Sequence, residues 1–198
     1  MAVSAKEVKQ LRDQTGAGMM DCKKALAEAG GDVEEAVRLL RTKGLAAAAK
    51  RSGRTTTQGL VDSYIHAGGK IGVLIEIGCE TDFVAKTNEF RAFVHDIAMH
   101  VAAADPRYVS RDDVPADEVE AELCIYREQA RETGKPENIL EKIAQGKLEK
   151  FYQQVCLLEQ PFVKDDKITV EQLRGELVGK LGENIEIKRF VRFELGKG

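Results

Sequence analysis

The fold class is indicated most clearly by KIGVLIEIGCETDFVAKTNEF, residues 70–90. Within this stretch a strand-like pattern changes into a helix-like one. In its first half, every second residue is a branched aliphatic one: Ile71, Val73, Ile75 and Ile77. Such alternation is typical of a strand with one buried face, and it predicts a strand over 70–80. We interpret the stripe as core and not as the lining of a ligand pocket.

Two further segments supply partners for this strand. GLVDSYIHA, residues 59–67, is rich in β-forming residues. The turn Ala67-Gly68-Gly69 joins it to the strand, so the two are expected to form a hairpin. IEIKRFVRFEL, residues 185–195, alternates apolar with mostly polar side chains. We predict that it forms a third strand, antiparallel to the hairpin.

Helical periodicity covers most of the remaining chain. Apolar residues at helical spacing predict helices over about 88–103, 117–133, 136–157 and 170–182. Gly134-Lys135-Pro136 separates the second of these helices from the third. QPFVKDDK, residues 160–167, is interpreted as an extended polar stretch. The predicted fold class is therefore α+β, with a small three-stranded antiparallel sheet covered by helices.

The first 44 residues predict a separate three-helix module. Ser4 and Glu7 form a capping-box pattern ahead of the first helix. Asp32 is placed to cap the third helix, and Gly44 is its expected end. Residues 45–58, LAAAAKRSGRTTTQ, predict a linker that is helical only at its start. The expected division is a head over 1–44, a linker over 45–58 and an α+β core and dimerisation domain over 59–198.

Composition narrows the class of protein. The chain has 198 residues, of which 43% are hydrophobic and 32% charged, and its formal net charge is −3. No apolar run approaches the roughly 20 residues of a membrane span, and a dedicated nucleic-acid binder would usually be basic. The first residues, MAVSAKEVKQ, do not resemble a secretory signal, and the four cysteines form no close pair. We expect a cytoplasmic protein with reduced thiols, without a membrane or direct nucleic-acid partner.

Residue patterns that carry enzymatic chemistry are weak. His95 and His100 are five positions apart, which is the wrong spacing for a helical metal-binding pair. Glu80 and Asp82 are a candidate acid/base pair, but acidic residues at strand ends are mostly solvated. The basic cluster Lys50-Arg51-x-x-Arg54 is interpreted as solvated linker, with a weak RNA contact as the alternative. The sequence predicts a protein that is not an enzyme, with no catalytic residue, cofactor or metal site.

The corner where strand becomes helix places Asp82 beside Phe83. In a buried corner, Phe83 would be the first core residue of the following helix. In an exposed corner, an apolar ring and a carboxylate would face solvent together, a shape suited to entering another protein. The residues alone leave both interpretations open. Thr81 is well placed to cap the turn in either case.

Two long stretches resemble the signatures of the elongation factor Ts family: LRDQTGAGMMDCKKAL, residues 11–26, and TDFVAKTNEF, residues 81–90. Shorter matches are SYIH (63–66), HVAA (100–103), QPFV (160–163), IKRF (187–190) and RFEL (192–195). The resemblance implies a ubiquitin-associated-like head and a core that grips elongation factor Tu. The implied function is guanine-nucleotide exchange by protein–protein contact, in which GDP is released from elongation factor Tu and GTP is loaded.

The resemblance also implies which residues contact the partner. The intruding corner would consist of Thr81, Asp82, Phe83 and Val84. Phe83 would wedge near the partner's Mg²⁺ site, displace the ligands of the ion and loosen the phosphate loop. Asp82 would compete for local hydrogen-bond donors.

A second set of contacts is expected from the head and the hairpin. The head candidates are Arg12, Met19, Met20 and Lys23. The methionines would give adaptable apolar contact, although one of them could instead belong to the core. His66, at the hairpin tip, matches a family position that meets the partner.

The chain resembles the short form of the family. Longer members carry two related core halves, whereas only one hairpin-plus-helix core fits here. We therefore predict a homodimer that packs sheet to sheet through residues 185–195 and binds two partner molecules, a 2:2 complex. The main alternative is a non-enzymatic adaptor with a ubiquitin-associated-like head on a dimerising domain. A small hydrolase using Glu80 and Asp82 is a weaker alternative, because no base or nucleophile is positioned beside them.

Overall fold

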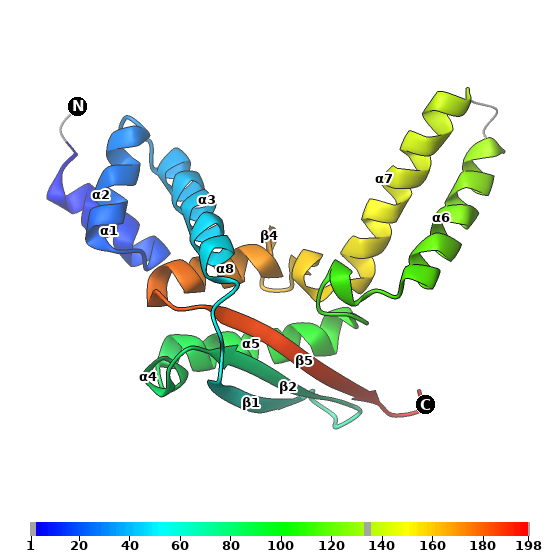
Figure 1. Cartoon of the computed structure of the whole chain (residues 1–198). Coiled ribbons are helices and arrows are strands. Elements are labelled where there is room, and N and C mark those ends of the chain that lie inside the picture. Colours follow the sequence, from blue (N-terminus) through cyan, green and yellow to red (C-terminus); the bar gives the residue numbers. More distant parts are fainter. Residues whose placement is uncertain (1–2, 133–135, 198) are drawn as a thin grey trace. The chain divides into compact units, whose positions relative to one another are not determined.

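The computed structural model describes residues 3–132 and 136–197. The chain divides into two compact units, one of residues 1–99 with 171–198 and one of residues 100–170. The predicted break at Gly134-Lys135-Pro136 falls partly outside the described residues. The first unit contains the N-terminal helices, the main sheet and the corner at Phe83, so it carries the candidate site (Figure 1).

Three helices form the N-terminal head, as predicted: α1 (Ala5–Thr15), α2 (Met19–Glu28) and α3 (Val33–Arg51). The capping box at Ser4 is present, and the Asp32 Oδ1 atom accepts a 3.0 Å hydrogen bond from the Glu35 N–H. The helices share a core of their own, formed by Val8, Leu11, Cys22, Ala25, Leu26 and Ala36. The head is therefore held together by its own apolar side chains.

The prediction that α3 ends at Gly44 is wrong. The helix continues to Arg51, and Gly44 is buried within it. A Cβ added at Gly44 would lie 2.9 Å from the Gly175 carbonyl oxygen in α8 (Val170–Leu181). Glycine is thus needed because two helices approach closely, and not because the chain turns. Arg41 Nε and Glu176 Oε1 form an ion pair of 2.8 Å between the same two helices.

The main sheet has the predicted three strands: β1 (Gln58–Ile65), β2 (Ile71–Cys79) and β5 (Ile185–Glu194). Their order is β1-β2-β5 with both pairs antiparallel. Val73, Ile75 and Ile77 are buried on one face, as the alternation predicts. Helix α5 (Asn88–Ala104) covers this face, where the His95 ring lies edge-on to Tyr64 at 5.7 Å.

The opposite face of the sheet is exposed, so helices cover only one side of it. Large apolar side chains are exposed along this outer sheet face: Val61, Ile65, Leu74, Val191, Phe193 and Leu195. Val61 and Ile65 belong to β1, Leu74 to β2, and Val191 and Phe193 to β5, while Leu195 directly follows β5. In the sheet, Leu74 pairs with Val191. A single chain leaves this strip of apolar surface in contact with water.

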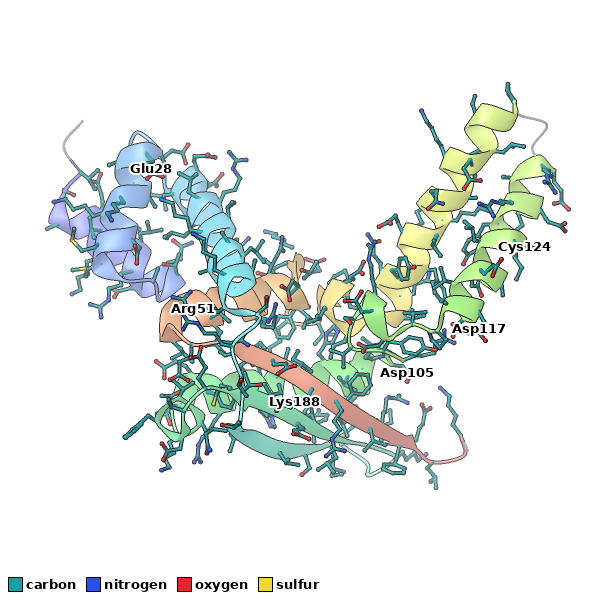
Figure 2. All side chains as sticks on the ribbon, viewed as in Figure 1. Glu28, Arg51, Asp105, Asp117, Cys124 and Lys188 are labelled. Carbon is teal, nitrogen blue, oxygen red and sulfur yellow. The ribbon has the colours of Figure 1, made fainter. Side chains whose placement is uncertain are left out.

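The segment between α3 and β1 is tied to the sheet. Figure 2 labels Arg51 at the end of α3 and Lys188 on β5. Lys188 Nζ donates a 2.6 Å hydrogen bond to the Thr56 carbonyl, and the Thr56 hydroxyl donates to Glu186. Thr56 is buried. The end of the predicted linker is therefore fixed at β5.

The second unit contains a pair of helices, α6 (Ala116–Arg131) and α7 (Glu137–Val155), which lie side by side (Figure 1). Bidentate hydrogen bonds from Arg127 to Glu141, at 2.8 and 2.9 Å, link them. The stretch interpreted as extended forms a second, two-stranded sheet of β3 (Pro161–Phe162) and β4 (Asp165–Thr169). Short 3-10 helices lie at Arg111–Asp113 and Leu157–Glu159.

His100 has a structural role in the second unit. It is fully buried; its Nε2 atom lies 2.9 Å from Gln160 Oε1, and its Nδ1 atom accepts a hydrogen bond from the Val163 N–H. Burial lowers the pKa of His100 below its usual value. These bonds fit a neutral imidazole that anchors the start of β3. Among the described residues, no helix is both long and apolar enough to cross a membrane.

Candidate protein-interaction site at the corner between β2 and α4

The corner is a single helical turn, α4 (Asp82–Ala85), which follows β2 directly. Thr81 is its N-cap residue, and its Oγ1 atom accepts a hydrogen bond of 3.4 Å from the Val84 N–H. This is the cap that the sequence predicts. It satisfies one of the backbone N–H groups that a helix start leaves without a partner.

The turn has one exposed and one buried face. Phe83 is 79% exposed, whereas Val84 and Ala85 are buried. The alternative in which Phe83 is the first core residue therefore fails, and Phe90, which is fully buried, takes that position on α5. Val84 was predicted as a contact residue, but its side chain packs inward because it lies on the opposite face of the turn from the ring. We conclude that Val84 supports the turn from inside.

Asp82 is exposed beside the ring and has a partner within the turn. Lys86 Nζ lies 2.6 Å from Asp82 Oδ2, an ion pair at i, i+4 spacing. The hydrogen bond from Lys86 lowers the pKa of Asp82 below its usual value. A donor on a partner protein would therefore share this carboxylate with Lys86 or displace it.

The two carboxylates of the acid/base alternative are each engaged by other groups. Glu80 accepts a 2.6 Å hydrogen bond from the Asn184 N–H and forms an ion pair with Arg54, while Asp82 pairs with Lys86. The two carboxylates therefore hold different partners. Cys79 is buried, its thiol donates to the Thr81 carbonyl, and burial raises its pKa to about 11. A thiol in this state is a poor nucleophile.

Sequence reasoning missed one residue of the corner. Glu183, from the loop between α8 and β5, accepts two hydrogen bonds from Thr81. The Thr81 N–H donates to Oε2 at 3.0 Å, and the Thr81 hydroxyl donates to Oε1 at 2.6 Å. The two residues are 102 positions apart, so no local pattern could indicate the contact.

The head presents a second exposed apolar feature. Gly16 ends α1 with a left-handed backbone, φ 68°, and α2 begins just after Gly18. Met19 is 45% exposed and Met20 is 63% exposed, so the alternative that one of them belongs to the core is wrong. Arg12 and Lys23 are also exposed. The four predicted head residues are thus accessible.

His66 is exposed at the tip of the β1–β2 hairpin, where its Nδ1 atom lies 3.1 Å from the Tyr64 hydroxyl. The corner at Thr81 follows the other end of β2. A strand of nine residues spans roughly 30 Å. His66 and Phe83 therefore cannot contact the same small feature of a partner.

The exposed aromatic ring on a capped turn is the kind of surface feature that a protein-binding factor presents. Residues 1–197 match the family model described as elongation factor TS, and the chain belongs to that family. It is 61% identical over 196 residues to elongation factor Ts of Carboxydothermus hydrogenoformans, covering 99% of this chain and 90% of that protein. It is 60% identical over 198 residues to that of Geobacter sulfurreducens, covering 100% and 92%.

Another relative, elongation factor Ts of Anaeromyxobacter sp., is 64% identical over 196 residues, with 99% of this chain and 90% of that protein covered. The family prediction is therefore confirmed. The main functional prediction is confirmed with it: the chain is a translation elongation factor that promotes nucleotide exchange on elongation factor Tu. The adaptor and hydrolase alternatives are set aside.

Proposed function

We propose that the protein releases GDP by inserting the Phe83 ring beside the Mg²⁺ site of elongation factor Tu. The observation that carries this proposal is the exposure of Phe83, 79%, on a turn capped by Thr81. Insertion would displace the ligands of the ion and loosen the loop whose amides and cation hold the β-phosphate. The protein changes no covalent bond, so it acts as an exchange factor and not as an enzyme.

Magnitudes show that the ring cannot act alone. A nucleotide bound at nanomolar affinity is held by about 12 kcal/mol. Weakening it by ~10⁴ requires about 5.5 kcal/mol of contact that favours the empty partner, because the coupling between two ligands is reciprocal. Burying one Phe side chain supplies ~1.5–3 kcal/mol. Other contacts must therefore also favour the deformed, nucleotide-free partner.

The head is proposed to dock on the partner's nucleotide domain through Arg12, Met19, Met20 and Lys23. Support comes from their exposure and from the separate core that holds α1–α3 together as a module. We further propose that this module is of the ubiquitin-associated type. His66, at the far end of the hairpin, would reach a different part of the partner. Because the partner is a translational GTPase, the proposed location is the cytoplasm.

A homodimer is proposed to cover the outer sheet face. The strip includes Phe193 at 69% exposure and Leu195 at 78%, and contiguous exposed apolar surface of this kind marks interaction sites. Two copies packed sheet to sheet would bury it and carry two partner molecules. Light scattering should give twice the 21.8 kDa mass of one chain, and Phe193→Glu should give the single-chain mass. A single-chain mass for the unmodified protein would reject the dimer.

Stopped-flow release of fluorescently labelled GDP from elongation factor Tu tests the exchange mechanism. We expect the unmodified chain to accelerate release strongly and Phe83→Ala to lower the maximal rate by about 10- to 100-fold, from the burial of one ring. The matched control is Ile125→Ala, which removes an exposed apolar side chain from α6 in the other unit. Full activity of Phe83→Ala would reject the wedge, and no acceleration by the unmodified chain would reject the whole proposal.

A further inference from the structure

The turn that carries Phe83 is too short to hold its own position. Helix α4 has four residues, and an isolated helix of that length is unstable in water. An exposed ring contributes fully to a partner contact only when its backbone is already in place, since ordering it on binding costs free energy. The groups that hold the turn therefore matter to the activity.

A relay of hydrogen bonds connects the turn to the loop between α8 and β5. The Thr81 hydroxyl donates to Glu183 at 2.6 Å and accepts from the Val84 N–H at 3.4 Å. Glu183 thus orients the hydroxyl so that its lone pair faces the start of the helix. The same carboxylate accepts the Thr81 N–H, which fixes the backbone of the cap residue. Phe83 lies two positions beyond this double attachment.

A second carboxylate makes the reverse connection. Glu80, which precedes Thr81, accepts the Asn184 N–H at 2.6 Å, next to Glu183. Asn184 is buried, and its side-chain amide donates to the Arg54 carbonyl at 2.9 Å. We call the reciprocal pair of attachments, Glu183 to Thr81 and Glu80 to Asn184, the corner clasp.

The clasp lies beyond the end of the sheet. The last paired residues of β2 and β5 are Cys79 and Ile185, and all four residues of the clasp lie outside that pair. The strands are already joined by their own ladder from Ile71 to Cys79. The clasp is therefore not needed for strand pairing, and its direct effect is on the turn.

We propose that Glu183 is a positioning residue for nucleotide exchange, which holds the Phe83 turn in the orientation that enters the partner. The inference rests on the proposed function, because it assigns Glu183 an effect that passes through the Phe83 ring. Glu80, just after the end of β2, supports the turn through its hydrogen bond from the Asn184 N–H. Glu183 itself need not touch the partner.

A double-mutant cycle between Glu183 and Phe83 tests the proposal. In the unmodified background, Glu183→Ala should lower the maximal rate of labelled-GDP release by about five- to tenfold, the cost of an unfixed ring. In the Phe83→Ala background it should lower the rate by less than about twofold, because there is no ring left to position. Glu141→Ala is the matched control, since it removes a carboxylate in the other unit that also accepts two hydrogen bonds from one residue, Arg127.

The outcomes separate the claims. Equal losses in both backgrounds, or no loss in either, would overturn the role of Glu183 as a positioning residue. Failure of the unmodified chain to accelerate release would instead reject the proposed function, and that result needs no Glu183 variant. If circular dichroism shows that Glu183→Ala is unfolded, Glu183→Gln replaces it in the cycle. Glutamine keeps one acceptor for the Thr81 hydroxyl but loses the second, and the same non-additivity is expected.

Discussion

Two helix starts in the same unit present apolar side chains to solvent, and they are built in opposite ways. At α4, Thr81 caps the turn and Glu183 fixes the cap, so a rigid aromatic ring is held in place. At α2, the N-cap position is Gly18, which has no side chain, and the exposed residues Met19 and Met20 are flexible. The backbone at the start of α4 is therefore fixed by side-chain hydrogen bonds, whereas the side chains at the start of α2 can adapt to a partner.

From this difference we infer separate contributions of the two helix starts to nucleotide exchange. A rigid ring can force a partner to change shape, because the ring does not yield first. Flexible methionines can follow a partner surface in both its loaded and its empty form. Contacts made equally in both forms raise affinity without raising the release rate, whereas contacts made only in the deformed form raise the rate. We therefore expect mutations at α4 to change the rate and mutations at α2 to change the affinity.

Among the further variants that test this comparison, the largest effect is expected from the double variant Met19→Ala, Met20→Ala. Each methionine would be partly buried against the partner, and the loss of both contacts would cost about 2 kcal/mol. This loss should raise the half-saturating concentration of the protein by roughly 30-fold. The maximal rate of GDP release should change by less than about twofold. A titration of release rate against protein concentration separates the two quantities, and Ile139→Ala in α7 is the control for an exposed apolar residue.

The opposite outcome would change the comparison. If the methionine variant lowers the maximal rate and leaves the half-saturating concentration unchanged, the head also takes part in deforming the partner. The start of α2 would then act together with the start of α4 in deforming the partner.

The next effect in size is expected from Thr81→Ala. Removing an N-cap side chain costs about 1 kcal/mol, which corresponds to a fall of about fivefold in the maximal release rate if the whole cost falls on the turn. Thr81→Ser keeps the hydroxyl and should retain most of the rate. The measurement is stopped-flow release at saturating protein. A rate unchanged in Thr81→Ala would show that the cap does not prepare the ring.

Features that could be predicted from the sequence are those set by near neighbours. The caps at Ser4, Asp32 and Thr81 each bind the backbone N–H three positions ahead, so the pattern is visible in four residues. The stripe of β2 repeats every second residue. The residues around Phe83 do not predict its exposure, because the same residues are compatible with a buried ring. Only the resemblance to a known family favours an exposed ring.

Features that could not be predicted depend on distant segments. Gly44 looks like a helix end, and its actual role is visible only when Gly175 of α8 lies against it. In the sequence, nothing distinguishes Glu183 from other loop glutamates, because its partner Thr81 is 102 positions away. The burial of Val84 has a different cause: one helical turn points successive side chains to different faces, so Val84 is buried where Phe83 is exposed.

The smallest effect is expected from Asp82→Asn. Asp82 and Lys86 form an exposed pair within one turn, and such pairs contribute little to stability, so the melting temperature at neutral pH should hardly change. If the carboxylate competes for donors on the partner, the maximal release rate should fall by about two- to threefold. Lys86→Ala is the matched control. It removes the competing cation and keeps the carboxylate, so the rate should be maintained or raised.

The bond between Lys86 and Asp82 also gives the stability of the fold a pH dependence of definite sign. The pKa of Asp82 is lowered in the folded protein by the bond from Lys86, so the stabilisation is present above the ordinary carboxyl pKa and is lost as the pH falls through the lowered value. At neutral pH the carboxylate is therefore charged in both the folded and unfolded chain, and a rate loss in Asp82→Asn without a matching loss in Lys86→Ala would come from the partner contact. Equal losses in Asp82→Asn and Lys86→Ala would mean instead that the ion pair shapes the turn, and Asp82 would then join Thr81 as a residue that acts only through the ring.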